Sequence, residues 1–145
     1  PTACKRVAFS LDAKLQALNI AANIEHHVKG DNRCDITAEC VISGESILLV
    51  IEAKGQWHTD LYTSAENQLY ERYSIHPKAQ NQGIYLVFWY GADVTVAGKK
   101  RHGIVSADQL RERLIEQMPS ELRKFIDVFV LDLSKNKTTS GGSFN

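Results

Sequence analysis

Cysteine, proline and long apolar runs are scarce in this sequence of 145 residues, and each scarcity excludes a class of protein. Its 3 cysteines have no Cys-Xaa-Xaa-Cys spacing and cannot supply a full set of zinc ligands, so we expect free thiols in a reducing compartment. No stretch approaches the roughly 20 apolar residues that cross a bilayer, and no signal peptide opens the chain. We therefore expect a cytoplasmic protein with no membrane partner.

Net charge is also lacking, because 17 Lys and Arg balance 17 Asp and Glu. This balance argues against a protein that binds nucleic acid through bulk positive charge, although it leaves room for a local basic surface. The one dense basic run before the C-terminal tail is Lys99-Lys100-Arg101-His102. It fits a phosphate-binding loop and an ordinary solvated loop equally well.

Length and composition indicate one domain over residues 1–133 and a flexible tail over residues 134–145. A chain of 145 residues can bury a core without disulfides or metals. The tail is composed mostly of Lys, Asn, Thr, Ser and Gly, which favours disorder. The first residue is Pro1 rather than methionine, so a module excised from a larger polypeptide fits the sequence as well as a complete gene product does.

The N-terminal part predicts a helix that Ser10 caps and that continues to about Lys29. Its apolar stripe is formed by Leu11, Leu15, Leu18 and Ala22. One further step along this stripe reaches Glu25, and a carboxylate on the core-facing side of a helix needs a partner. Glu25 is therefore either a metal ligand or the partner of a basic residue near the helix end, and we weigh the two interpretations equally.

Beyond this helix, the apolar patterns predict a hairpin of two strands, a helix capped by Thr59 or Asp60, a central strand, a helix with a capping box at Ser106, and a last strand. These elements cover residues 36–42 and 47–51, 61–75, 84–90, 106–118 and 126–133, in that order. The order predicts an α/β fold, a layered sandwich with a central mixed β-sheet flanked by helices.

Three polar residues adjoin the predicted hairpin strands: Asp35 precedes the first, and Glu52 and Lys54 follow the second. The run Ile47 to Ile51 reads as a strand buried on both faces, and such a strand has no structural need for an acid and an amine at its end. Glu52 and Lys54 are two positions apart and point to the same side. Mg²⁺ prefers carboxylate oxygens, and it can activate water and stabilise a phosphate during hydrolysis. The pattern therefore predicts a metal-dependent phosphodiesterase.

An Asp, a spacer and Glu-Xaa-Lys after an apolar run resemble the PD-(D/E)XK nuclease superfamily, which has the restriction-endonuclease-like fold. The resemblance covers the element order from the first helix through the central strand, and Cys34 stands where that family often has proline. It implies that Asp35, Glu52 and the backbone carbonyl of Ala53 bind Mg²⁺ or Mn²⁺. Lys54 would then act on the attacking water or on the phosphate charge, and a helix glutamate such as Glu25 would be an additional ligand.

Gln68 lies on the predicted second helix, on one face with Leu61, Ala65 and Arg72. In the RecB-like branch of the superfamily, a glutamine with a tyrosine four residues later lies near the metal, whereas here that later position holds Arg72. The resemblance places Gln68 in the catalytic site, with surface hydrogen bonding as the alternative. Arg72 fits phosphate binding or a solvated surface equally well.

Plainer interpretations exist for these residues. Glu52 and Lys54 alone are consistent with an ordinary salt bridge at a strand end, because Glu-Xaa-Lys is common by chance. Trp57, in the loop after Lys54, fits stacking on a base or packing over the sheet edge. The apolar run, Asp35 and Gln68 together favour a functional site over the salt bridge.

We therefore expect a metal-dependent nuclease whose partner is nucleic acid, with DNA as the expected substrate, acting as a homodimer or as part of a larger polypeptide. Residues 66–73 and 83–90 also resemble nuclease modules at the C-terminal ends of large bacterial defence proteins, which implies antiviral defence. Two rivals stay open, an RNase or tRNase effector of the same fold and a catalytically silent binding module of that fold. Alanine at Glu52 or Lys54 is expected to abolish cleavage with little loss of stability.

Overall fold

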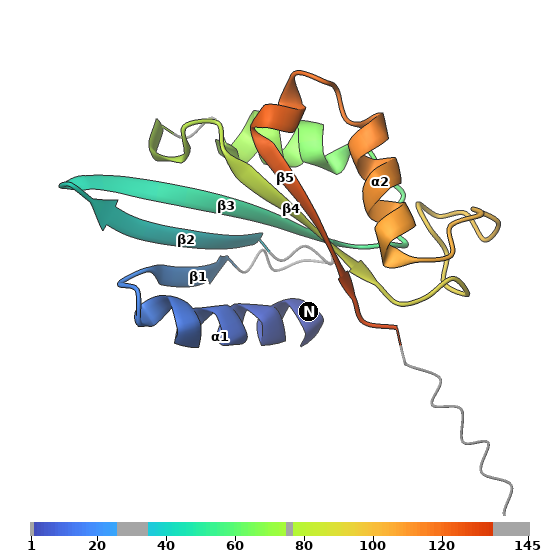
Figure 1. The fold of residues 1–145 in the computed structure, drawn as a ribbon, viewed down its shortest axis with the longest axis horizontal. Helices are drawn as coiled ribbons and strands as arrows, with labels where there is room; N and C mark the ends of the chain where they lie inside the picture. The colour runs from blue at the N-terminus through green and yellow to red at the C-terminus, as the bar shows by residue number, and fades with distance from the viewer. Residues whose placement is uncertain (1, 26–34, 75–76, 135–145) are drawn as a thin grey trace, which may run out of the picture.

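The computed structural model describes residues 2–25, 35–74 and 77–134, without the side chains at positions 2, 24, 25, 35 and 71–74 (Figure 1). The elements are α1 (Thr2–Gln16), β1 (Ala21–Glu25), β2 (Asp35–Ile42), β3 (Glu45–Gly55), the π-helical η1 (Ala65–Ser74), the 3₁₀ turn η2 (Pro77–Ala79), β4 (Gly83–Trp89), α2 (Ala107–Gln117), the 3₁₀ turn η3 (Leu122–Lys124) and β5 (Ile126–Asp132). Within these residues, no helix combines the length and apolarity that a membrane span requires.

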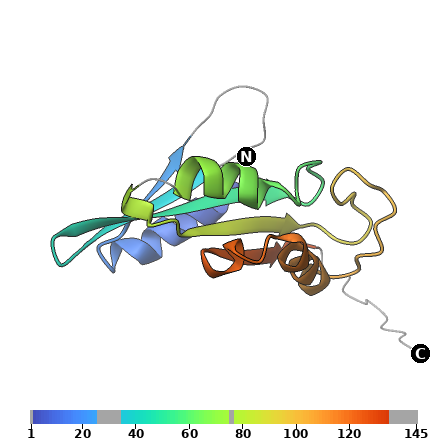
Figure 2. The same cartoon turned by 90° about the horizontal axis from the view of Figure 1, so that it is seen from above.

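One mixed sheet with the strand order β1-β2-β3-β4-β5 forms the middle of the protein. The first three strands are antiparallel, and β3, β4 and β5 are parallel. Both parallel connections move in the same direction across the sheet, so right-handed crossovers place η1 and α2 on the same face. Helix α1 lies on the opposite face, as the two views in Figures 1 and 2 show. The predicted layered α/β fold is confirmed.

The predicted hairpin is formed by β2 and β3, with Ile42 paired to Glu45. Its two-residue turn is Ser43-Gly44, whose φ angles of 53° and 84° are both positive, as the tightest hairpin turns require. β3 continues to Gly55 and becomes fully buried along its second half. The strand is therefore longer than the apolar run, and its buried end includes the acid and the amine that follow that run.

The predicted helix over residues 11–29 is correct only over residues 11–16. Ser10 lies inside α1 and does not cap it, residues 17–25 are not helical, and residues 26–29 lie outside the described part. α1 ends at Gln16, and Asn19 then adopts a left-handed φ of 57°, a conformation that stops a helix and that asparagine tolerates well. The following residues form β1, which pairs antiparallel with β2 and sets Glu25 opposite Asp35. Glu25 therefore lies at the end of a strand and not on a helix. The leucine spacing did not reveal the end of the helix, because a short apolar segment is compatible with a helix and with a strand.

The C-terminal half agrees more closely with the predictions. Ser106 caps α2 by accepting a hydrogen bond of 3.2 Å from the backbone nitrogen of Gln109, and Met118 ends the helix. β4 is a central strand, as expected. The second predicted helix is the π-helical η1, and apolar spacing alone does not separate this wider coil from an α-helix.

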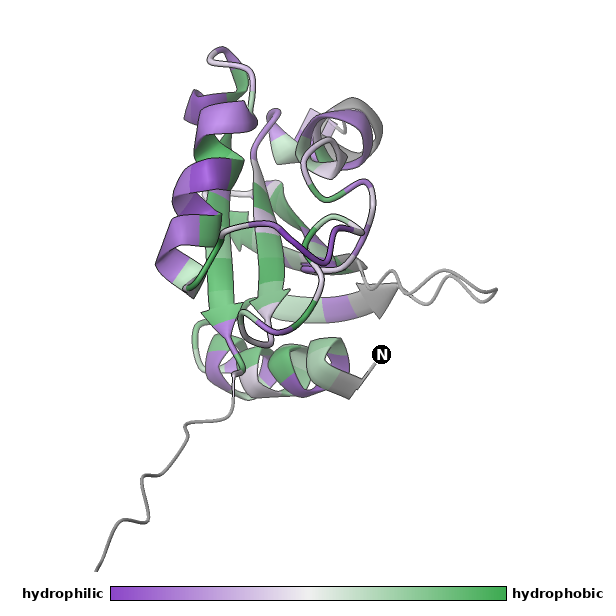
Figure 3. Ribbon diagram, turned by 90° about the vertical axis from the view of Figure 1, so that its right-hand side faces the viewer, coloured by the Kyte–Doolittle hydropathy of each residue, from purple (hydrophilic) through white to green (hydrophobic). Residues whose placement is uncertain are grey.

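Two apolar clusters pack on the two faces of the sheet, and Figure 3 shows the apolar strands between helices with hydrophilic outer surfaces. The cluster under η1 and α2 includes Val50, Tyr85, Val87, Leu110 and Val128. The cluster under α1 includes Cys4, Ala8, Ile51, Leu86 and Phe88. Because strand residues alternate between faces, Val50, Glu52 and Lys54 belong to the η1 side.

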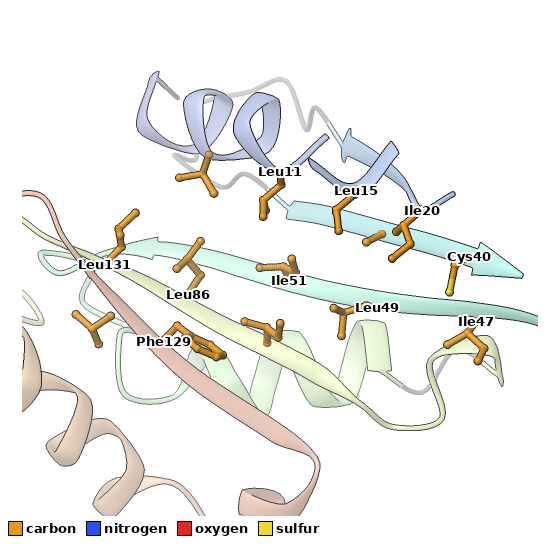
Figure 4. A pocket seen from close by; sticks show the side chains of 14 residues that line it. Leu11, Leu15, Ile20, Cys40, Ile47, Leu49, Ile51, Leu86, Phe129 and Leu131 are labelled. Carbon is orange, nitrogen blue, oxygen red and sulfur yellow. The ribbon is translucent and has the colours of Figure 1, made fainter. Parts of the chain in front are cut away.

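Helix α1 does not fill the face that it covers. Figure 4 shows an apolar cavity of about 530 Å³ between α1 and the sheet, lined by residues such as Leu11, Leu15 and Leu86. Phe129 of β5 also lines it and remains 53 % exposed. The cover over β4 and β5 is therefore incomplete.

The cysteines differ in state. Cys40 is a free thiol at this cavity, as expected. Cys4 is disulfide-bonded, so the expectation of free thiols is wrong for this residue.

Candidate active site

One row of polar residues runs across four neighbouring strands. Glu25 of β1 pairs with Asp35 of β2. β2 and β3 are paired up to the residues adjacent to Asp35 and Glu52. Glu52 in turn pairs with Tyr85 of β4. The backbone therefore aligns three acidic positions and a tyrosine, although the side chains of Glu25 and Asp35 lie outside the described part.

Lys54 and Glu52 form a buried ion pair on the η1 side of β3. Each side chain is 1 % exposed, and Nζ of Lys54 lies 3.5 Å from Oε1 of Glu52. The same Nζ lies 3.3 Å from Oδ2 of Asp60. Burying an isolated ammonium costs several kcal/mol, so Lys54 depends on these two carboxylates for its place in the core.

Asp60 is the residue of this cluster that the sequence predicts only as a helix cap. Its Oδ2 accepts a hydrogen bond of 2.9 Å from Nε2 of Gln68, which is 7 % exposed. Its Oδ1 lies 3.9 Å from Nδ1 of His58. The hydroxyl of Ser64 donates to the backbone carbonyl of Asp60 at 2.8 Å and fixes the loop. The sequence signal that could have identified Asp60 is its position, an acidic residue in the loop between Glu-Xaa-Lys and the helix that carries Gln68.

The local charges keep Asp60 ionised. Burial alone would raise its pKa, but the charge of Lys54, with hydrogen bonds from Lys54 and Ser64, outweighs burial and lowers the pKa below its ordinary value. Asp60 is therefore a carboxylate near neutral pH, and it shares Lys54 with Glu52.

Tyr85 closes the cluster from β4. Its hydroxyl donates a hydrogen bond of 2.7 Å to the backbone carbonyl of Leu61. Burial raises its pKa strongly, a hydrogen bond with Ser64 lowers it, and the negative charges of Glu52 and Asp60 raise it further. The phenol therefore stays neutral and acts as a donor that orders the start of the loop.

The acceptor atoms of this cluster suit a hard cation. Oδ1 of Asp60 and Oε1 of Gln68 are buried without a hydrogen-bond partner among the described residues. Mg²⁺ and Mn²⁺ take such oxygen ligands together with water. The described side chains contain no group of three or more His, Cys, Asp or Glu that could hold a metal, and the side chains of Glu25 and Asp35 are not among them. The ligand set Asp35, Glu52, Ala53 and Glu25 therefore stays a prediction.

The structure brings Glu52, Lys54 and Gln68 together, with Asp60 as the residue that links them. Leu61, Ala65 and Gln68 are buried, in agreement with the predicted helix face. The side chain of Arg72 lies outside the described part. Ala53 points into the cluster under α1, so only its backbone is available to the site.

Comparisons with protein-family models, with curated proteins and with solved structures found no match to this chain.

Proposed function

We propose that this chain is a divalent-metal-dependent nuclease of the PD-(D/E)XK type that hydrolyses phosphodiester bonds in DNA. The observation that carries the proposal is the buried Glu52–Lys54 pair at the end of β3, in one row with the backbone of Asp35. A Glu-Xaa-Lys sequence that occurs by chance is expected at the protein surface, where charged side chains cost little free energy. Their burial is costly, and active sites are where such costs are commonly retained.

Contacts support the roles of Glu52, Lys54 and Gln68, and the resemblance to the nuclease superfamily supplies those of Asp35 and Glu25. Glu52 and Asp35 would hold Mg²⁺, with Glu25 and the carbonyl of Ala53 as further ligands. The bound ion supplies Lewis-acid chemistry to the phosphate and the water. Lys54, fixed between Glu52 and Asp60, presents its ammonium group beside the metal ligands. Gln68 holds Asp60 in the orientation that contacts Lys54.

Cleavage of plasmid and linear DNA with Mg²⁺, and with EDTA, tests the proposal. We expect metal-dependent cleavage by the wild type and a loss of at least about a hundredfold in Glu52→Gln, Lys54→Met and Asp35→Asn, since removal of one electrostatic group commonly costs that much. Glu45→Gln is the matched control, because Glu45 is an exposed acid at the other end of β3. Full turnover in Glu52→Gln or Asp35→Asn would reject the site.

A catalytically silent binding module of the same fold is the second candidate. It is favoured by the two carboxylates that already surround Lys54, because they compensate its charge without a metal or a phosphate. Calorimetric titration of the folded protein with Mn²⁺ separates the two functions: saturable binding that Glu52→Gln removes supports the nuclease, and no binding supports the silent module. Matched RNA substrates in the cleavage assay test the RNase alternative.

A further inference from the structure

Two partly exposed aromatic rings stand beside this site, at the ends of neighbouring parallel strands. Trp57 follows β3 and Tyr90 follows β4, and each side chain is 37 % exposed. Their ring centroids are 5.4 Å apart, with planes inclined by 49°. The other tryptophan, Trp89, is buried at 2 % exposure. The chain therefore places one indole in the core and one at the surface, in the loop that leads from β3 to Asp60.

Trp57 is held in a fixed place. A Cβ atom on Gly55 would lie 2.5 Å from the indole ring, so the ring rests directly on the glycine backbone. On another side the indole stacks with the ring of His58, at 6.0 Å between centroids and 25° between planes. An aromatic side chain that is already ordered loses little entropy when a flat ligand stacks on it.

The stacked rings connect Trp57 to the polar cluster. Nδ1 of His58 lies 3.9 Å from Oδ1 of Asp60. Oδ2 of Asp60 lies 3.3 Å from Nζ of Lys54. Two side chains, those of His58 and Asp60, therefore connect the indole to Lys54, the amine proposed to act beside the metal ligands.

A basic turn is fastened to the same loop. Val96 and Lys99 pair across the two-residue turn Ala97-Gly98, whose φ angles are 49° and 75°. The backbone nitrogen of Gly98 donates to the carbonyl of Trp57 at 3.1 Å. These bonds hold the turn against the loop that carries the indole.

The turn begins the run Lys99, Lys100 and Arg101, and all three residues are exposed. Three cations on a structured turn, in a chain with no net charge, make a local anion-binding surface. Asp93, also exposed, contributes one opposing charge from the preceding loop. The basic run therefore begins at an ordered turn that is hydrogen-bonded to the backbone of Trp57.

We propose that Trp57, Tyr90 and the basic turn over residues 97–101 form a subsite for an unpaired stretch of nucleic acid, in which a base packs against the exposed parts of Trp57 and Tyr90 and neighbouring phosphates contact the turn. Exposed aromatic rings beside backbone-tracking cations are the means by which proteins bind single strands without reading sequence. The identification of this polymer as substrate rests on the proposed nuclease function. The subsite predicts a preference for single-stranded DNA or frayed ends over intact duplex.

Tryptophan fluorescence tests the subsite without catalysis. In EDTA, an oligodeoxythymidine of about 16 nucleotides is titrated against the wild type, with a duplex of the same length for comparison. We expect quenching, because Trp57 stacks while the buried Trp89 does not respond. Trp57→Leu should lose about tenfold or more in affinity, measured by anisotropy of a labelled strand, and Trp57→Phe should keep part of it. Circular dichroism of both variants checks that they fold.

The salt dependence of binding tests the basic turn. Each phosphate contact to a single strand contributes about 0.7 to the slope of log affinity against log salt, so a variant with alanine at residues 99–101 should lose about 2 from that slope. Phe9→Leu and Lys14→Ala are matched controls, because both residues are exposed on α1 and neither belongs to the proposed subsite. Both should bind as the wild type does.

The outcomes separate this subsite from the nuclease proposal. Wild-type affinity in Trp57→Leu, or no single-strand binding by the wild type, overturns the subsite even where DNA is cleaved. Equal losses in Phe9→Leu and Trp57→Leu also overturn it. Trp57-dependent binding without any metal-dependent cleavage supports the subsite and rejects the nuclease proposal. The protein would then be the catalytically silent binding module.

Discussion

Oδ2 of Asp60 accepts a hydrogen bond of 2.9 Å from Gln68 and lies 3.3 Å from Nζ of Lys54. One oxygen of a loop aspartate thus joins a glutamine on η1 to a lysine on β3. This contact orients Lys54, because the amine would otherwise be fixed by Glu52 alone within the described part of the cluster. The predictions below follow from this network and from the loop that carries it.

Replacing Asp60 with asparagine should lower both activity and stability. The neutral amide leaves Lys54 with one carboxylate, and it weakens a charge-assisted hydrogen bond that is typically worth about 1.5–3 kcal/mol. We expect a drop of that order in the free energy of unfolding, measured in urea, and at least tenfold slower DNA cleavage. Asp93→Asn, in an exposed loop, should change neither quantity.

Lys54→Met and Glu52→Gln should show strong coupling in a double-mutant cycle. The expectation that single substitutions leave stability intact conflicts with the structure, because Glu52 and Lys54 carry opposite charges and are both buried. Removing one partner of a buried pair typically costs about 3–5 kcal/mol, since the other charge is left uncompensated. The double variant should recover part of this loss in urea unfolding. Strictly additive losses would show that the two charges do not interact.

The contribution of Asp60 to stability should disappear in acid. Its pKa is lowered in the folded protein, so below the ordinary aspartate value of about 3.9 the unfolded chain binds more protons than the folded one. The contribution is therefore complete above that pH and is lost as the pH falls through the folded pKa. Urea midpoints of the wild type and Asp60→Asn should converge between neutral pH and about pH 2. A constant difference between them would exclude this titration.

Gln56→Leu should loosen the loop that carries the basic turn. The Gln56 side chain is fully buried, and its Nε2 donates to the carbonyls of Gly91 and Val94 at 3.0 and 3.1 Å. Leucine would remove the side-chain donor to Gly91 and the acceptor of the Tyr90 backbone nitrogen, at about 1–3 kcal/mol each, while the Val94 carbonyl keeps the ring of His102 as a partner. We expect a lower urea midpoint and faster proteolysis within residues 91–103. Unchanged proteolysis would mean that backbone bonds alone hold this loop.

The sequence predicts four of the five strands and part of the site. β4 is buried along most of its length and β3 along its second half, so their apolar runs predict strands and make Glu52 and Lys54 stand out. β1 was missed because Asn19 ends the helix within a segment whose apolar spacing continues. Asp60 was missed as a site residue because its role depends on a loop path that brings it back to Lys54, and loop paths are set by tertiary contacts such as the Ser64 and Tyr85 hydrogen bonds.

The incomplete packing beneath α1 implies two levels of cooperativity within one small domain. Only Cys4 and Ala8 are buried among the described side chains of this helix, and both are small, so little apolar area opposes its detachment. The disulfide at Cys4 holds the N-terminal end of α1. The part of the helix beyond Ala8 should therefore open before global unfolding, and its amide hydrogens should exchange with solvent sooner than those of β3 and β4. The strands that carry Glu52, Lys54 and Tyr85 would keep their geometry while α1, on the opposite face of the sheet, opens locally.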